Sequence, residues 1–93
     1  MKLEIGKEKY PFRHVGEIKG ATIKGFKGKD LHLTLLTLDD MKERHKQMKD
    51  ARAIPVYVAF DQKEQALWFF PTPAAPYEVN VKGSSTITLP KKQ

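Results

Sequence analysis

The stretch Ala66-Leu-Trp-Phe-Phe-Pro-Thr-Pro-Ala-Ala-Pro-Tyr-Glu-Val-Asn-Val-Lys82 is the densest apolar and aromatic segment of this 93-residue chain. Its first part, Ala66 to Phe70, is apolar at every position. We therefore expect a strand that is either buried on both faces or turns one apolar face toward a partner. The last part, Tyr77 to Lys82, alternates apolar and polar residues, which predicts a strand with one core-facing side. Three prolines stiffen the loop between the two predicted strands.

The neighbouring residues extend this pattern into a sheet. Val56 to Phe60 is predicted to be a strand, and the polar segment Asp61 to Glu64 has the length of a hairpin turn. The strand at Ala66 then returns antiparallel to it. With Tyr77 to Lys82 and a last alternating segment, Thr86 to Leu89, this half of the chain predicts a four-strand antiparallel meander.

The first half of the chain is punctuated by glycine. A short strand is expected between Gly20 and Gly25, followed by a turn in which Gly28 can take a positive φ. Leu31 to Leu36 alternates and predicts a strand with one buried face. Residues 1–12 show only weak patterning, so we expect a flexible arm, and the sequence leaves open whether it orders on assembly.

One helix is predicted, over about residues 38–51. Thr37 is a good N-cap, and the acidic residues after it complement the positive end of the helix dipole. The apolar stripe is narrow, which places the helix at the edge of the domain; the stripe consists of Leu38, Met41, His45 and Met48. The predicted fold class is mainly β, a small antiparallel β-sandwich or partly open barrel with one short edge helix, in a single domain spanning residues 1–93.

Composition narrows the function classes. The chain has no cysteine, which excludes disulfides and thiolate metal sites. No apolar run approaches the roughly 20 residues that a membrane span needs, so we expect no membrane contact. The formal net charge is +6, and residues 1–29 hold eight Lys or Arg against three acids. A basic surface attracts phosphate or an acidic protein face.

Catalytic and metal-binding patterns are missing from the sequence. The three histidines (His14, His32 and His45) are not spaced as metal ligands, and the only serines, Ser84 and Ser85, lack a nucleophile motif. The acidic residues at the helix start are explained by capping. We therefore predict no enzyme activity, no catalytic residues, no metal and no cofactor.

Two functional hypotheses remain from the residues alone. The apolar strand and its proline loop favour a protein interface, and the interface candidates are Trp68, Phe70, Pro71, Thr72, Pro73 and Pro76. The basic turn favours contact with nucleic acid or an acidic surface through Lys24, Lys27 and Lys29. The second hypothesis corresponds to a small basic nucleic-acid-binding β-domain.

About half of the chain resembles a segment of tailed-phage head–tail connector proteins, also called adaptor or neck proteins. The matching pieces, in order, are Leu36-Thr-Leu-Asp-Asp-Met41, Pro55-Val-Tyr-Val-Ala-Phe60 and Leu67-Trp-Phe-Phe-Pro-Thr-Pro-Ala-Ala-Pro-Tyr-Glu-Val-Asn-Val81. Prolines such as those of the Pro-x-Pro-x-x-x-Tyr element are common in hairpin loops, whereas the order and spacing of all three pieces together are not.

This resemblance implies a structural virion protein that is assembled in the host cytoplasm. It implies copies of the same chain in a ring, contacts with other virion proteins such as portal or tail components, and proximity to DNA. Stopper, tail-completion, capsid-decorating and accessory neck positions are all compatible with the pattern.

Overall fold

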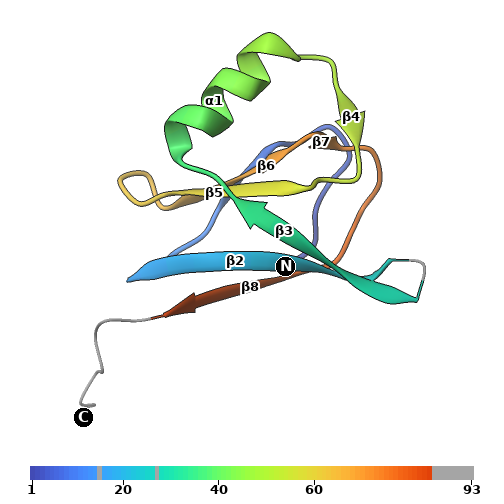
Figure 1. The fold of residues 1–93 in the computed structure, drawn as a ribbon, viewed down its shortest axis with the longest axis horizontal. Coiled ribbons are helices and arrows are strands. Elements are labelled where there is room, and N and C mark those ends of the chain that lie inside the picture. The colour runs from blue at the N-terminus through green and yellow to red at the C-terminus, as the bar shows by residue number, and fades with distance from the viewer. Residues whose placement is uncertain (15, 27, 85–93) are drawn as a thin grey trace.

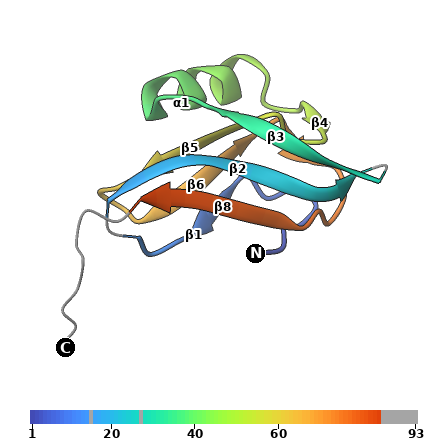
Figure 2. The same ribbon diagram turned by 60° about the horizontal axis from the view of Figure 1, so that its bottom comes forward.

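The fold is a curled β-sheet with one helix on its outer side (Figure 1). A computed structural model describes residues 1–14, 16–26 and 28–84. The predicted class is confirmed: the chain is mainly β, and its six-stranded sheet forms a half-barrel, in keeping with a partly open barrel and one short helix. Figure 2 shows the curl from below, with β8 along one rim and β1 beneath it.

The six strands lie in the order β1-β6-β5-β3-β2-β8, and their bounds are β1 (Lys9–Pro11), β2 (Glu17–Phe26), β3 (Lys29–Leu35), β5 (Tyr57–Asp61), β6 (Ala66–Phe70) and β8 (Val79–Ser84). All neighbours are antiparallel except β3 and β5, which are parallel. A second, two-stranded parallel sheet joins β4 (Arg52–Ala53) to β7 (Thr72–Pro73). The helix α1 spans Leu38–Gln47.

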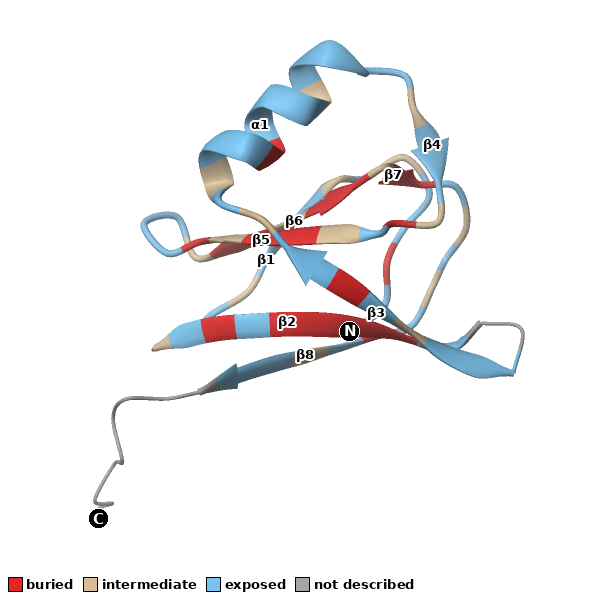
Figure 3. Cartoon of the chain, viewed as in Figure 1, coloured by how far each residue is buried: buried red, intermediate tan, exposed pale blue. Residues whose placement is uncertain are grey.

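The hairpin predicted for residues 56–60 and 66–70 is confirmed. β5 and β6 pair antiparallel across a polar turn. β6 is apolar throughout because it is covered on both faces: Leu67 and Phe69 lie in the core inside the curl, and Phe70 packs under α1 with Met41. Figure 3 shows this burial concentrated in β2, β5 and β6, while most of α1 is exposed.

The predicted meander is wrong. β8 does not return beside β6 but pairs with β2 on the other side of the half-barrel. The proline loop is the reason, because Thr72 and Pro73 pair with β4 and carry the chain away from β6. The core-facing side of β8 was predicted correctly, since Val79 is fully buried while Asn80 is exposed. The predicted strand Thr86 to Leu89 lies outside the described residues.

The sequence predicted that glycines interrupt the strands in the first half of the chain, and this prediction is wrong for Gly20 and Gly25. β2 runs through both Gly20 and Gly25 as one ten-residue strand, with irregular register near each of them. Gly25 adopts a φ of 69°, and its N–H donates a hydrogen bond to the Asp30 carboxylate at 3.2 Å. Gly28 has a φ of 77°, which confirms the predicted turn. The strand was longer than expected because flanking strands supply its pairing partners at these irregular positions.

The helix begins where predicted and ends earlier. The Thr37 hydroxyl accepts a hydrogen bond from the Asp40 N–H at 3.2 Å, as an N-cap does. α1 stops at Gln47, and Met48 is its C-cap with 57% of its surface exposed. Met48 is therefore not part of the packed stripe. His45 holds the helix to the sheet, because its Nε2 lies 2.8 Å from the carbonyl oxygen of Phe69.

Residues 1–12 do not form the flexible arm that we predicted from the sequence. Met1 and Leu3 hydrogen-bond residues 77–79 beside one rim of the sheet, and Lys9–Pro11 forms β1 at the opposite rim. Leu3 is fully buried in the main core. The sequence of residues 1–12 lacks a regular apolar pattern because a short segment that joins two strands needs only a few buried side chains, here Leu3 and Tyr10.

We predict that Leu3→Ala lowers the free energy of unfolding by about 2–5 kcal/mol, because it opens a cavity at a fully buried site. Ile5→Ala is the matched control, since Ile5 is 60% exposed and its truncation should change stability by less than about 0.5 kcal/mol. Urea unfolding of the three proteins measures both effects. Equal midpoints for Leu3→Ala and the wild type would show that the segment contributes nothing to the fold.

The raised pKa of Tyr10 leads to a prediction of how stability depends on pH. Burial raises the pKa of its phenol above the usual value, and the carboxylates of Glu4 and Glu8 add to the rise. The neutral form is therefore favoured in the folded state, so this stabilisation is present below the unfolded pKa of about 10 and is lost as pH rises through the folded pKa. Tyr10→Phe cannot ionise, and should lose less stability than the wild type between pH 9 and pH 11 in urea unfolding. An identical loss in both proteins would contradict the prediction.

Candidate protein-binding groove

The sheet forks where β3 changes partner. β3 pairs with β2 through residues 31–33, and then pairs with β5 through Thr34 and Leu35. On β2, pairing with β3 begins only at Ala21, although residues 17–20 already pair with β8 on the other side. The first residues of β2 and the last residues of β3 therefore diverge and are not paired with each other.

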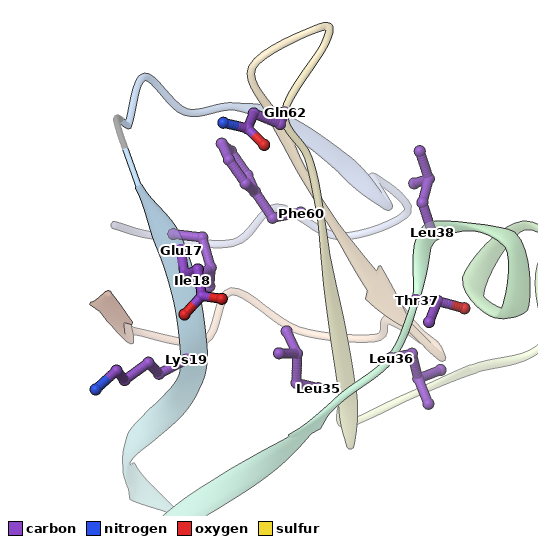
Figure 4. A pocket seen from close by; sticks show the side chains of 9 residues that line it. All are labelled: Glu17, Ile18, Lys19, Leu35, Leu36, Thr37, Leu38, Phe60 and Gln62. Carbon is purple, nitrogen blue, oxygen red and sulfur yellow. The ribbon is translucent and has the colours of Figure 1, made fainter. Parts of the chain in front are cut away.

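A groove opens at this fork, with a volume of about 370 Å³. It is lined by residues of β2, the end of β3, the start of α1 and β5, namely Glu17, Ile18, Lys19, Leu35, Leu36, Thr37, Leu38, Phe60 and Gln62. Figure 4 shows Leu35 projecting into the space between β2 and β5, while Lys19 extends away from it. Apolar side chains make up more of the lining than polar ones.

Leu35 is exposed although it lies in a strand of the sheet. Leu35 was predicted to face the core together with Leu31 and Leu33, but 44% of its surface is exposed, whereas Leu33 is 7% exposed. The reason is the fork, because the strand that would cover Leu35 has turned away. Ile18, which is buried, and Phe60, which is half-buried, line the groove together with Leu35, and these three residues are its apolar floor.

An aromatic cluster supports one end of the groove. Phe12 and His14 each contact the ring of Phe60 edge-on, at centroid distances of 6.3 and 6.2 Å. His14 Nε2 also lies 3.2 Å from the carbonyl oxygen of Glu17. A Cβ on Gly83 would lie 2.7 Å from that nitrogen, so only glycine fits where β8 passes His14. These contacts connect the start of β2 to the β5 side of the groove.

The groove combines a few charged and polar groups with apolar side chains. Its charged groups are Glu17 and Lys19, its uncharged polar groups are Thr37 and Gln62, and the remaining lining side chains are apolar. Within residues 1–14, 16–26 and 28–84, no cluster of three or more His, Cys, Asp or Glu is placed to hold a metal ion. Such a groove can accept apolar side chains, and the diverging strands beside it suit an extended backbone.

The predicted interface residues lie elsewhere, on the outer side of β6 and in the proline loop. Phe70 is 5% exposed and packs against α1, so it belongs to the core of the chain itself. Trp68 is half-buried between Lys9 and Lys42, whose ammonium groups lie 5.3 and 5.9 Å from its ring. In the loop, Thr72 and Pro73 are buried, Pro71 is half-buried and Pro76 is exposed. Of the candidates, only Trp68, Pro71 and Pro76 retain accessible surface of any extent.

Part of the positive charge at the predicted nucleic-acid contact is compensated by a carboxylate. Lys24 Nζ lies 3.1 Å from the Asp30 carboxylate, and this hydrogen bond is the main reason that the pKa of Asp30 is lowered. Lys29 is exposed on the adjoining strand, and Lys27 lies outside the described residues. The aromatic cluster of Phe12, His14 and Phe60 sits at the groove instead of beside this turn.

Sequence reasoning missed the groove because its residues come from four separate segments. The one local signal was the pair Leu35-Leu36, which places adjacent leucines on opposite sides of a strand end. An alternating pattern alone assigns Leu35 to the core, and only the pairing of β3 shows that its cover is missing.

No protein-family model matches the chain, and neither the curated proteins nor the solved structures contain a match to it. Among the described residues, the single helix is too short and too polar to cross a bilayer.

Proposed function

We propose that this chain is a non-enzymatic assembly protein that binds other protein chains through the groove at the fork of its sheet. The observation that carries the proposal is the exposed Leu35 on an apolar floor with Ile18 and Phe60. An apolar surface that is hollowed and flanked by diverging strands fits a partner segment, whereas a catalytic site would need polar groups that converge inside it.

We further propose that the assembly is the head–tail junction of a tailed phage, where the chain would be present in several copies and contact portal or tail components. Support for this setting is the resemblance carried by residues 36–41, 55–60 and 67–81. These residues form the start of α1, the strands β5 and β6, the proline loop and the beginning of β8. The groove borders the first two of these pieces, through Leu36 to Leu38 and Phe60.

A single contact in which a partner covers the apolar side chains of the groove gives weak binding. Full burial of a Leu or Phe side chain contributes roughly 1.5–3 kcal/mol, and here part of each side chain is already covered. Association also has a cost in translational and rotational freedom, of about 4–15 kcal/mol. Closure of a ring eases this limit, because the contact that closes the ring forms between chains that are already associated and does not incur the association cost again. The groove therefore suits a many-copy assembly better than a solitary dimer.

We predict that Leu35→Asp abolishes self-association or the binding of a partner virion protein, because it places a charge on the apolar floor. Ile5→Asp is the matched control, since Ile5 is 60% exposed and lies outside the groove. Sedimentation velocity over a range of concentrations, alone and with candidate partners, measures the effect.

The proposal fails if the wild-type protein stays monomeric at high concentration and binds no other virion protein. It also fails if Leu35→Asp and Ile5→Asp reduce association equally, since the groove would then have no special role.

The alternative function, a basic nucleic-acid-binding domain, is favoured by the net charge of +6. We expect only weak binding through its basic turn, because Asp30 already pairs with Lys24. Titration of a fluorescent single-stranded oligonucleotide at about 50 mM salt and above tests this. Tight binding with a steep salt dependence would favour the nucleic-acid function over assembly, and Asp30→Asn should then strengthen it.

A further inference from the structure

Trp68 stands on the outer side of the sheet, between an edge strand and the helix. It pairs with Lys9 of β1 and with Ala59 of β5, and the side chains of directly opposed residues share one face of a sheet. Phe70, two residues along β6, is on the same face and packs under α1. β1 is the last strand at that edge of the sheet, so the indole ring lies near the margin of the fold. Trp68 is therefore only half-buried, whereas Phe70 is covered.

Positive charge gathers around this ring. The ammonium groups of Lys9 and Lys42 lie 5.3 and 5.9 Å from the ring centre, within the range of a cation–π contact. Lys46 follows Lys42 by four residues, so it lies on the same flank of α1, and both side chains are exposed. Lys9 also donates a hydrogen bond to the Glu64 carboxylate. In the described part of the chain no carboxylate forms an ion pair with Lys42, so the charge on the helix side of the ring is uncompensated.

The polar groups next to the ring are mainly hydrogen-bond donors. Trp68 Nε1 is buried and has no hydrogen-bond partner among the residues that the structure describes. An indole nitrogen can only donate, and a lysine ammonium likewise has no acceptor capacity. A buried donor without an acceptor is unfavourable, so a ligand oxygen that reaches it forms a stabilising hydrogen bond. The surroundings of the ring are therefore complementary to a ligand that carries negatively charged oxygen atoms.

We propose that Trp68, Lys9 and Lys42 form a contact site for single-stranded nucleic acid, with a base on the indole ring and phosphates on the lysines. Sites for single strands combine basic side chains with aromatic rings on which bases stack. An acidic protein segment would use the lysines but would leave the ring without a role. In a duplex the bases are stacked on one another and are not free to cover the ring, so the site distinguishes a single strand from a duplex.

This site is separate from the groove. None of its side chains lines the groove, which opens at the fork of β2 and β3. It is also separate from the basic turn between β2 and β3, where Lys24 pairs with Asp30. A single stacked base and a few phosphate contacts give moderate affinity, so the contact adds to an assembly function without replacing it. The inference goes beyond the proposed function and does not depend on it.

The intrinsic fluorescence of the full-length protein tests the proposal directly, because Trp68 is its only tryptophan. Titration with an oligothymidylate of about 12 nucleotides, at about 50 mM salt, should quench this fluorescence to saturation. A DNA duplex of the same length and poly-glutamate are the matched polyanions. Each should quench with an affinity that is weaker by at least about fivefold, because neither offers a free base to the ring.

Variants are compared by the anisotropy of the same oligonucleotide carrying a fluorescein label. Trp68→Leu should weaken binding by about 5- to 150-fold, which corresponds to the loss of one stacked base. Lys42→Gln should weaken binding and lower the slope of log affinity against log salt by about 0.7, as the loss of one phosphate contact does on a single strand. Lys42 is exposed on the helix, so this variant keeps the test valid if Trp68→Leu does not fold. The matched control is Lys82→Gln, because Lys82 is exposed on β8 at the opposite rim of the sheet, and it should change affinity by less than about twofold.

Unchanged tryptophan fluorescence with every polyanion would overturn the proposal. Equal quenching by the duplex or by poly-glutamate would also overturn it, and would assign the lysines to anionic surfaces in general. A loss with Lys82→Gln as large as that with Lys42→Gln would attribute binding to the overall charge of the chain. Each of these results leaves the effect of Leu35→Asp on association unchanged, so failure of this inference is distinguishable from failure of the proposed function.

Discussion

The curl of the sheet depends on the N-terminal segment that joins its two rims. Residues 1–3 pair with residues 77–79, and residues 9–11 pair with β6, so a stretch of eleven residues connects both ends of the half-barrel. Leu3 and Tyr10 fill the space between, and the Tyr10 hydroxyl accepts a hydrogen bond from the Glu4 N–H and donates one to the Lys7 carbonyl. Without this connection the main core would be open along one side.

At another position in the sheet, β3 separates from β2. Adjacent strands are rotated by about 20–25° relative to each other, and a strand that pairs with two differently directed neighbours cannot follow both along its length. β3 follows β2 first and β5 later. The groove, with Leu35 exposed in it, is the geometric result of this exchange, and is therefore tied to the fold as a whole.

On the outer side of β5 and β6, apolar residues that could have formed an interface with a partner are instead covered by the helix of the same chain. α1 covers Phe70 and Ala59 through Met41, and Arg44 lies over the Tyr57 ring at 4.5 Å. A helix with so narrow an apolar stripe can cover only a small area, so Trp68 remains at its margin. One short helix thereby removes most of the aromatic surface that the sequence offers for a partner.

Local pattern was sufficient to predict the mainly β class, the hairpin of β5 and β6, the N-cap at Thr37 and the buried face of β8, because each depends on residues close together in the chain. The tertiary structure alone decided that β8 joins β2, that residues 1–12 complete the sheet, and that Leu35 lies in a groove. These three outcomes depend on which distant strands pair. Alternation specifies which side of a strand is apolar, but does not specify which neighbour will cover it.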